Sequence, residues 1–201
     1  MGIDIYLSAE LKEHGSWTPA PSPVENEYSD DHELVPCELH VLDRRPYGLF
    51  SVLSGASVGL RCANDQIPAI SKTRGFPEDM NDFYQDYFAE RFENVSGFYG
   101  ASWLMLSELV DFDWDQKVSR VAYVERKYAK LFHKHEPFPA HFPKEQKLYH
   151  GLFKDPLENT EKVHWCISVA DYVGNSHQHL IKALNRLGSK ERLRIIYWFS
   201  C

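Results

Sequence analysis

The sequence has no long apolar run. None of its stretches reaches the roughly 20 consecutive apolar residues that a helix needs to cross a bilayer. The first six residues also lack a basic region followed by an apolar segment, and Tyr6 stands where a myristoylation signal requires Ser or Thr. We therefore expect a soluble, cytoplasmic protein with no membrane partner.

Cysteine is scarce, and no pair of cysteines has the CxxC spacing of a zinc site. The chain contains four: Cys37, Cys62, Cys166 and Cys201. Their wide separation disfavours both a zinc ribbon and a small scaffold held by disulfides. We expect reduced thiols, most of them buried.

An excess of positive charge is also missing. The chain has 22 Lys and Arg against 29 Asp and Glu, a net charge of −7 with a pI near 5.8. Such a balance provides no broad basic face for a phosphate backbone, so nucleic acid is not a favoured partner. The acidic residues are spread along the chain rather than massed, which indicates a solvated acidic surface rather than a mimic of DNA.

The common catalytic motifs are absent as well. There is no nucleophile elbow, phosphate-binding loop or dinucleotide fingerprint, and the glycine pair at 55–59 lacks the lysine and the spacing of a phosphate loop. We expect no cofactor, and the sequence leans toward a protein that is not an enzyme.

What the sequence does contain is the material for one folded domain spanning 1–201, with 43% hydrophobic and 14% aromatic residues. Apolar and polar residues alternate over 2–11, as in a strand with one buried face, so one face of this strand should be wet or near a sheet edge. Residues 192–200 are almost entirely apolar, β-branched or aromatic, which indicates a central strand buried on both faces. The two terminal strands are expected to be neighbours.

Helical periodicity completes an α+β prediction with a small sheet and about four helices. An aromatic stripe over 78–94 predicts a helix whose stripe faces the core. Ser102 is placed to cap a helix through Leu109, and a further helix is predicted over 116–133. After a strand at 162–167, Ser168 and Asp171 form a capping box for a helix that runs to Leu187, or begins near Asn175 because Gly174 weakens it.

The connecting segments are less regular. Trp17 begins a short hairpin return, and three prolines with an acidic run make 18–33 an exposed loop. Residues 34–43 read as an extended segment, and 47–54 as one or two helical turns. Four prolines over 136–159 predict irregular structure there.

Several motifs occur in an order that we recognise. They are Met1–Tyr6 (MGIDIY), Asp43–Phe50 (DRRPYGLF), Arg74–Asp79 (RGFPED), Ala101–Leu109 (ASWLMLSEL) with Phe112–Trp114 (FDW), and Arg194–Phe199 (RIIYWF). In this order they resemble a family of uncharacterised proteins encoded by bacteriophages, prophages and their bacterial hosts. The resemblance implies a phage or bacterial accessory protein, brings no reaction or catalytic residue with it, and leaves 115–160 as a variable insertion. Family members tend to have Asn-Tyr-Asp at 46–48 and His-Ser-Trp at 101–103, where this chain has Pro-Tyr-Gly and Ala-Ser-Trp.

Two clusters raise the question of a metal. The first consists of histidines near 140, namely His133, His135, His141 and His150, and the second of Asp111, Asp113 and Asp115. The histidines fall at a helix end and in a proline-rich loop without a metal-ligand framework, and the aspartates lack the glycine and glutamate of a calcium loop. We expect no metal site, and we expect the aspartates to support the start of the next helix. His177 and His179 are expected at the surface or its boundary.

A looser set of polar and aromatic residues remains as a candidate ligand site: Arg45, Tyr47, Arg74, Ser102, Trp103 and Glu108. Guanidinium groups beside an aromatic ring and a helix N-terminus can hold an anion. Our leading hypothesis is a non-catalytic binding or inhibitory protein that engages a host protein or a small anionic ligand. One alternative is a nucleotide-directed transferase or hydrolase that uses the Arg, Ser and Glu residues, and another is a structural or assembly protein.

Overall fold

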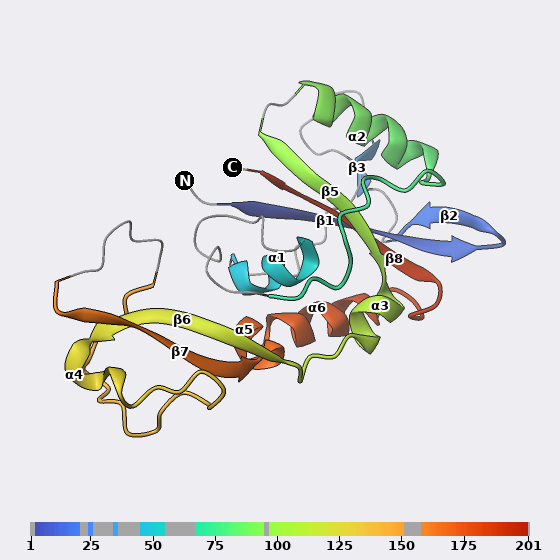
Figure 1. Cartoon of the computed structure of the whole chain (residues 1–201). Coiled ribbons are helices and arrows are strands. Elements are labelled where there is room, and N and C mark those ends of the chain that lie inside the picture. Colours follow the sequence, from blue (N-terminus) through green and yellow to red (C-terminus); the bar gives the residue numbers. More distant parts are fainter. Residues whose placement is uncertain are drawn as a thin grey trace. The chain divides into compact units, whose positions relative to one another are not determined.

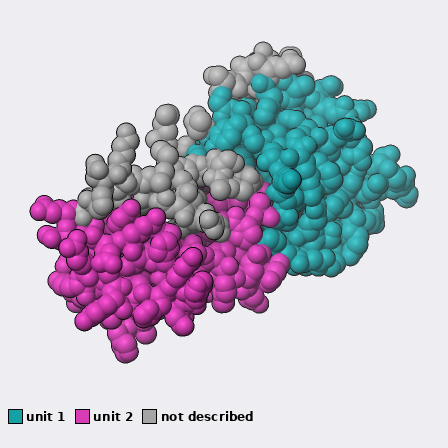
Figure 2. Space-filling model, in the orientation of Figure 1, with its two compact units in different colours: residues 1–45, 70–112, 176–201 teal, residues 46–69, 113–175 magenta. Residues whose placement is uncertain are grey.

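The computed structural model describes residues 3–20, 24–25, 34–35, 45–54, 67–94, 97–150 and 158–200. The chain divides into two compact units, which are coloured separately in Figure 2. Unit 1 consists of Met1–Arg45, Ile70–Phe112 and Ser176–Cys201, and unit 2 consists of Pro46–Ala69 and Asp113–Asn175. The α+β class is confirmed, and the assignment of the whole chain to one domain stays a prediction.

Unit 1 is built on a four-stranded antiparallel sheet in the order β2-β1-β8-β5. Its strands are β1 (Asp4–Glu13), β2 (Ser16–Pro19), β5 (Phe98–Met105) and β8 (Leu193–Ser200). The first and last strands pair along their length, from Asp4 opposite Ser200 to Leu11 opposite Leu193. Both predictions about β8 are therefore confirmed: it is central, and it is the neighbour of the N-terminal strand (Figure 1).

A tight hairpin joins β1 to β2. Glu13 pairs with Ser16, so the loop consists of His14 and Gly15 alone, and both have positive φ angles, 49° and 92°. This is the geometry of a two-residue turn whose twist matches that of the strands. The return strand expected at Trp17 is confirmed.

Both faces of this sheet are covered. The helix α2 (Asp82–Asn94) lies on one face, and α3 (Leu106–Asp111) and α6 (Ser176–Leu184) lie on the other (Figure 1). The aromatic stripe of α2 packs on the sheet as predicted, because Tyr84 and Phe88 share a buried cluster with Ile196 and Trp198. The helix starts at Asp82 rather than at 78, since the Asn81 side chain caps it by accepting from the N–H of Phe83 at 3.0 Å.

The expectation for β1 is correct in one of its two alternatives: the strand lies beside the edge strand β2, but its polar face is not wet at the centre. Ser8 and Glu10 on this face are fully buried, and Glu10 accepts from the N–H of Asn81 just before α2. Tyr6, on the same face, stacks on Trp198 with ring centroids 5.4 Å apart. The alternation of the strand was read correctly, but the helix that covers its polar side lies about 70 residues away along the chain.

Ser102 does not cap a helix, which corrects a second expectation. It lies inside β5, fully buried, and the helix that follows starts only at Leu106. Residues Ser102–Met105 form a strand rather than a helix because β8 offers a complete row of backbone partners from Tyr197 to Arg194. Local capping chemistry competes weakly with such long-range pairing.

Unit 2 contains a two-stranded antiparallel sheet, β6 (Lys117–Glu125) with β7 (Thr160–Ser168), and three helices among its described residues. These helices are α1 (Tyr47–Ser54), α4 (Arg126–Ala129) and α5 (Val169–Val173). The strand expected at 162–167 and the helical turns at 47–54 are confirmed. The Ser168 side chain accepts from the N–H of Asp171 at 3.0 Å, as the capping box predicted, and the break at Gly174 separates α5 from α6.

The helix predicted over 116–133 is wrong. Val121 and Val124 matched a helical period, yet they belong to β6, which pairs with β7 over nine residues. Only Arg126–Ala129 is helical in this stretch. The β-branched valines suit a strand, and the partner that stabilises it lies some 40 residues further on.

The remaining predictions fall partly outside the described residues. The exposed loop predicted over 18–33 is wrong at its start, because Thr18 and Pro19 belong to β2 and Ala20 is buried. Further along, Val24–Glu25 form β3, which pairs with β4 (Leu34–Val35) at the start of the predicted extended segment. The irregular structure expected over 136–159 is confirmed for residues 136–150. None of the helices in the described ranges has the length and apolar character to cross a membrane.

Candidate functional site

Arg74 lies beside the outer edge of β5, in the segment that leads to α2. The Arg74 N–H donates to the Ser102 hydroxyl at 3.0 Å, and the N–H of Gly75 donates to the carbonyl of Ala101 at 3.1 Å. These bonds occupy part of the free edge of the sheet, where an unpaired strand would expose its backbone. Ser102 thus holds the backbone of Arg74.

The side chain of Arg74 is engaged on three sides. Its Nη1 and Nη2 atoms donate to the two carboxylate oxygens of Glu108 at 2.8 and 2.5 Å. Nη1 also lies 3.3 Å from the carbonyl of Trp103, and the guanidinium sits over the Trp103 ring, 4.7 Å from its centroid. The structure therefore brings together four of the six predicted site residues: Arg74, Ser102, Trp103 and Glu108.

Glu108 is held by the helix that carries it. It occupies the first turn of α3, and its Oε2 accepts from the N–H of Met105 at 2.9 Å. The Arg74 guanidinium holds the pKa of Glu108 below its ordinary range, and Glu108 in turn raises the pKa of Arg74. The two side chains are about one third exposed, at 29% and 32%.

Behind this pair lies a phenol. Tyr197 stands opposite Ser102 in the β5–β8 ladder and is fully buried, and burial raises its pKa although Ser102 hydrogen-bonds to it. The charges of Arg74 and Glu108 act on it in opposite directions. The arrangement therefore connects a partly exposed ion pair to the buried centre of the sheet.

Arg45 and Tyr47 do not join these four residues. Arg45 forms its own bidentate pair with Asp4, at 2.5 and 3.0 Å, in unit 1, and both side chains are about half exposed. Tyr47 begins α1 in unit 2 and packs its ring edge-on against Phe50, with centroids 5.7 Å apart. The predicted six-residue site is reduced to the cluster around Arg74.

Sequence reasoning missed a second charged cluster, centred on Arg194. This arginine of the central strand is 1% exposed; its Nε donates to Glu10 at 2.6 Å and its Nη1 donates to Asp79 at 2.6 Å. Trp17 donates its indole N–H to the other oxygen of Asp79 at 2.8 Å, and the N–H of Asn81 donates to Glu10 at 2.7 Å. Burial raises the pKa of Glu10, while the hydrogen bond from Arg194 lowers that of the more exposed Asp79.

The two clusters form one alternating stack of aromatic rings and guanidinium groups. Arg194 lies 3.9 Å from the Trp17 centroid and 5.7 Å from that of Trp103, and Arg74 follows over Trp103. Each guanidinium is paired with a carboxylate, so the positive charges of the stack are neutralised by its own residues. The signal was present in the sequence, because Glu10 and Arg194 are opposite charges at facing positions of two strands that were expected to pair.

The histidine and aspartate clusters do not assemble a metal site. No group of three His, Cys, Asp or Glu side chains within the described ranges is arranged to hold an ion. Asp111 pairs with Lys190 at 2.8 Å, and Asp113 accepts from the N–H of Asp115 at 3.1 Å. These aspartates precede the strand β6, so the expected support of a helix start was wrong.

The remaining candidates are placed as follows. His133, His135, His141 and His150 are exposed, His179 is exposed, and His177 is buried in α6, where a surface or boundary position was expected. Cys166 is a free, partly buried thiol whose sulfur lies 3.1 Å from the carbonyl of Lys134, and the other three cysteines fall outside the described residues.

Comparison of the chain with protein-family models, curated proteins and solved structures found no match.

Proposed function

We propose that this protein is a non-catalytic binding protein, an accessory factor of the phage or prophage type that acts in the cytoplasm by engaging a host protein. The observation that carries the proposal is the closed pairing of Arg74 with Glu108. These are the residues that a nucleotide-directed enzyme would need free for substrate.

The pairing argues against an anion site at Arg74. Guanidinium groups recognise phosphate and carboxylate through parallel N–H donors, and both donor positions here already meet the oxygens of Glu108. An incoming anion would have to displace a carboxylate that also holds the N–H of Met105 at the start of α3. Arg74, Ser102 and Glu108 are better explained as a tie between the sheet edge, its preceding segment and a helix.

The experiment that tests the proposal separates ligand effects from stability. Thermal unfolding is measured for the wild type, Arg74→Ala and Glu108→Gln, each with and without a nucleoside triphosphate or a dinucleotide, and turnover of both compounds is followed. We expect both variants to melt below the wild type and neither compound to shift any of the three curves.

The Arg45→Ala variant is a matched control, because it removes a bidentate arginine from a more exposed carboxylate in the same unit. Turnover by the wild type that Glu108→Gln abolishes, with the melting of that variant still cooperative, would establish the enzyme alternative instead. Co-purification with virion proteins from infected cells would favour an assembly role.

A further inference from the structure

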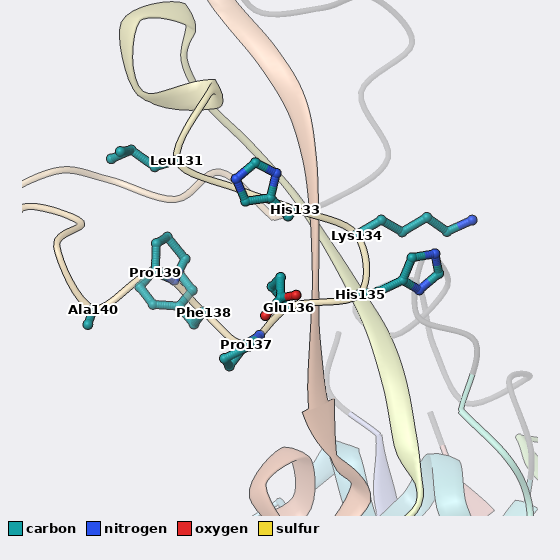
Figure 3. Close-up of a pocket in the computed structure, with 9 residues that line it drawn as sticks. All are labelled: Leu131, His133, Lys134, His135, Glu136, Pro137, Phe138, Pro139 and Ala140. Carbon is teal, nitrogen blue, oxygen red and sulfur yellow. The ribbon is translucent and has the colours of Figure 1, made fainter.

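Unit 2 carries an open groove that no part of the ion-pair stack uses. Residues Leu131 to Ala140 curve around a space of about 700 Å³ (Figure 3). Leu131 and Phe138 lie on one side of the loop, and Lys134 and His135 project from the other. The loop thus presents apolar side chains on one side and Lys134 with His135 on the other, and Glu136 also lines the groove.

The apolar side is preformed by an aromatic cluster. Phe138 is 36% exposed, and its ring lies edge-on to Phe132, Phe142 and Trp165 with centroids 5.4 to 5.5 Å apart. Phe132 and Trp165 are buried, so the exposed ring rests on a fixed base. An aromatic surface ordered before binding loses little side-chain entropy when a partner docks.

The backbone of the groove is anchored to β7. The N–H of Cys166 in β7 donates to the carbonyl of Glu136 at 2.8 Å, a bond that is separate from the pairing of β7 with β6. The N–H of Glu136 donates to the carbonyl of His133 at 3.1 Å. Pro137 and Pro139 restrict the next residues. These bonds and prolines therefore anchor the backbone between Lys134 and Phe138.

The charge of this region is opposite to that of the rest of the chain. Unit 1 has eleven Lys and Arg against nineteen Asp and Glu, a net charge of −8, whereas unit 2 has eleven against ten, a net of +1. The segment 126–150 alone has six Lys and Arg against two Asp and Glu, together with four of the ten histidines. Burial lowers the pKa of nearby His164, and the charges of Lys162 and Lys134 lower it further, as expected in a positive local potential.

We propose that the loop Leu131 to Ala140 is the docking site of an acidic peptide segment of the partner protein, with one apolar anchor residue on Phe138 in the groove and carboxylates that reach Lys134 and His135 on the other side of the loop. This inference rests on the proposed binding function and names its surface and the chemistry of its partner. A peptide suits the groove better than a nucleic acid does, because the aromatic rings pack edge-on against one another and offer few flat faces for stacked bases.

The test uses the full chain and a panel of short fluorescein-labelled peptides rich in Glu and Asp, each with one Phe, Leu or Trp at varied positions. Fluorescence anisotropy compares them with Gln and Asn analogues, with acidic peptides that lack the anchor, and with an oligothymidylate of equal charge. We expect binding only when acid and anchor are both present, and weaker binding as salt rises.

Two variants locate the contact. Lys134→Glu should weaken peptide binding about tenfold, since reversing one cation turns an attraction into a repulsion. Lys72→Glu, an exposed lysine of unit 1, makes the same change in net charge and should leave affinity within about twofold. Phe138→Ala should weaken binding of anchored peptides selectively, with thermal melting confirming that each variant is folded.

The outcomes are separable from those of the proposed function. Peptides that bind equally well to wild type and Lys134→Glu, or that fail to bind the wild type at millimolar concentration, overturn the groove as the docking site and leave the nucleotide tests on Arg74 and Glu108 untouched. Tighter binding of the oligothymidylate, abolished by Lys134→Glu, would assign the surface to nucleic acid instead.

Discussion

The guanidinium carbon of Arg194 lies 3.9 Å from the centroid of the Trp17 ring, and both side chains contact the same carboxylate, that of Asp79. Three parts of unit 1 meet at this point: the central strand β8, the hairpin strand β2 and the segment that precedes α2. Glu10 of β1 completes the charge balance from the buried side. The contact ties the hairpin to the centre of the sheet by planar stacking as well as by charge.

We predict that Arg194→Met destabilises the protein by about 3–5 kcal/mol, because removal of one partner leaves the fully buried Glu10 without its counter-ion. The double variant Arg194→Met with Glu10→Leu should lose less stability than the single variant, since no uncompensated charge remains. Urea denaturation of the wild type, the two single variants Arg194→Met and Glu10→Leu, and the double variant measures these values.

Arg192→Met is the matched control, because Arg192 directly precedes β8 but is 55% exposed and donates to the carbonyl of Lys12. Its loss should cost about 1 kcal/mol or less. A double variant that is as unstable as the sum of its single variants would show that Arg194 and Glu10 act independently.

The elements that sequence patterns predicted correctly are those whose signal is local. The aromatic stripe of α2, the capping box at Ser168 and the apolar run of β8 each depend on spacings within one segment. β5 and β6 were misread because their conformation is decided by strands that lie far away in the chain, β8 and β7. A helical period of three or four valines and leucines cannot outweigh a complete ladder of such partners.

Gly100 provides a test of backbone geometry at the edge of the sheet. It has a φ of +66° at the irregularity of β5 between Tyr99 and Ser102, and a Cβ atom there would lie 3.1 Å from the ring of Phe199. Gly100→Ala should therefore cost backbone strain of about 1–2 kcal/mol and an additional packing penalty.

Gly15→Ala separates the backbone strain from the packing penalty, because Gly15 also has a positive φ but a Cβ atom added to it would meet nothing within 4 Å. Its cost should be the strain alone, and differential scanning calorimetry should give a larger loss of stability for Gly100→Ala. Equal losses would mean that Phe199 yields without penalty.

The pH dependence of stability should differ in sign between two glutamates. The folded pKa of Glu108 is lowered, chiefly by its hydrogen bond to Arg74, so its contribution is present above its ordinary pKa of 4.5 and is lost as pH falls through the folded pKa. The folded pKa of Glu10 is raised, chiefly by burial, so its contribution is present below 4.5 and is lost as pH rises through the folded pKa.

Glu108→Gln and Glu10→Gln isolate the two effects when unfolding free energies are measured from pH 4 to pH 7. The advantage of the wild type over Glu108→Gln should grow as pH rises, and its advantage over Glu10→Gln should shrink. Two differences that both grow with pH would indicate that Arg194 outweighs the burial of Glu10.

The candidate site was predictable in part for a related reason. Arg74, Ser102, Trp103 and Glu108 were chosen as polar and aromatic residues beside apolar runs, and the sheet edge does gather them. Their mutual pairing was not predictable, because it depends on the start of α3 at Leu106, three residues later than a cap at Ser102 implies. Because α3 starts there, the Arg74 guanidinium that was a candidate for binding an anion pairs with Glu108 instead.

Ser8 offers a test of how completely the polar face of β1 is satisfied beneath α2. It is fully buried, and within the part of the chain that the structure describes its hydroxyl has no hydrogen-bond partner. A buried hydroxyl without a partner carries a desolvation penalty, so Ser8→Ala should be neutral or should stabilise the protein by up to about 1 kcal/mol.

Ser102→Ala is the control, because Ser102 is equally buried in the same sheet but accepts from the N–H of Arg74, and its loss should cost about 1–3 kcal/mol. Urea denaturation of both variants measures the contrast, and a loss above about 1 kcal/mol for Ser8→Ala would mean that its hydroxyl is hydrogen-bonded in solution.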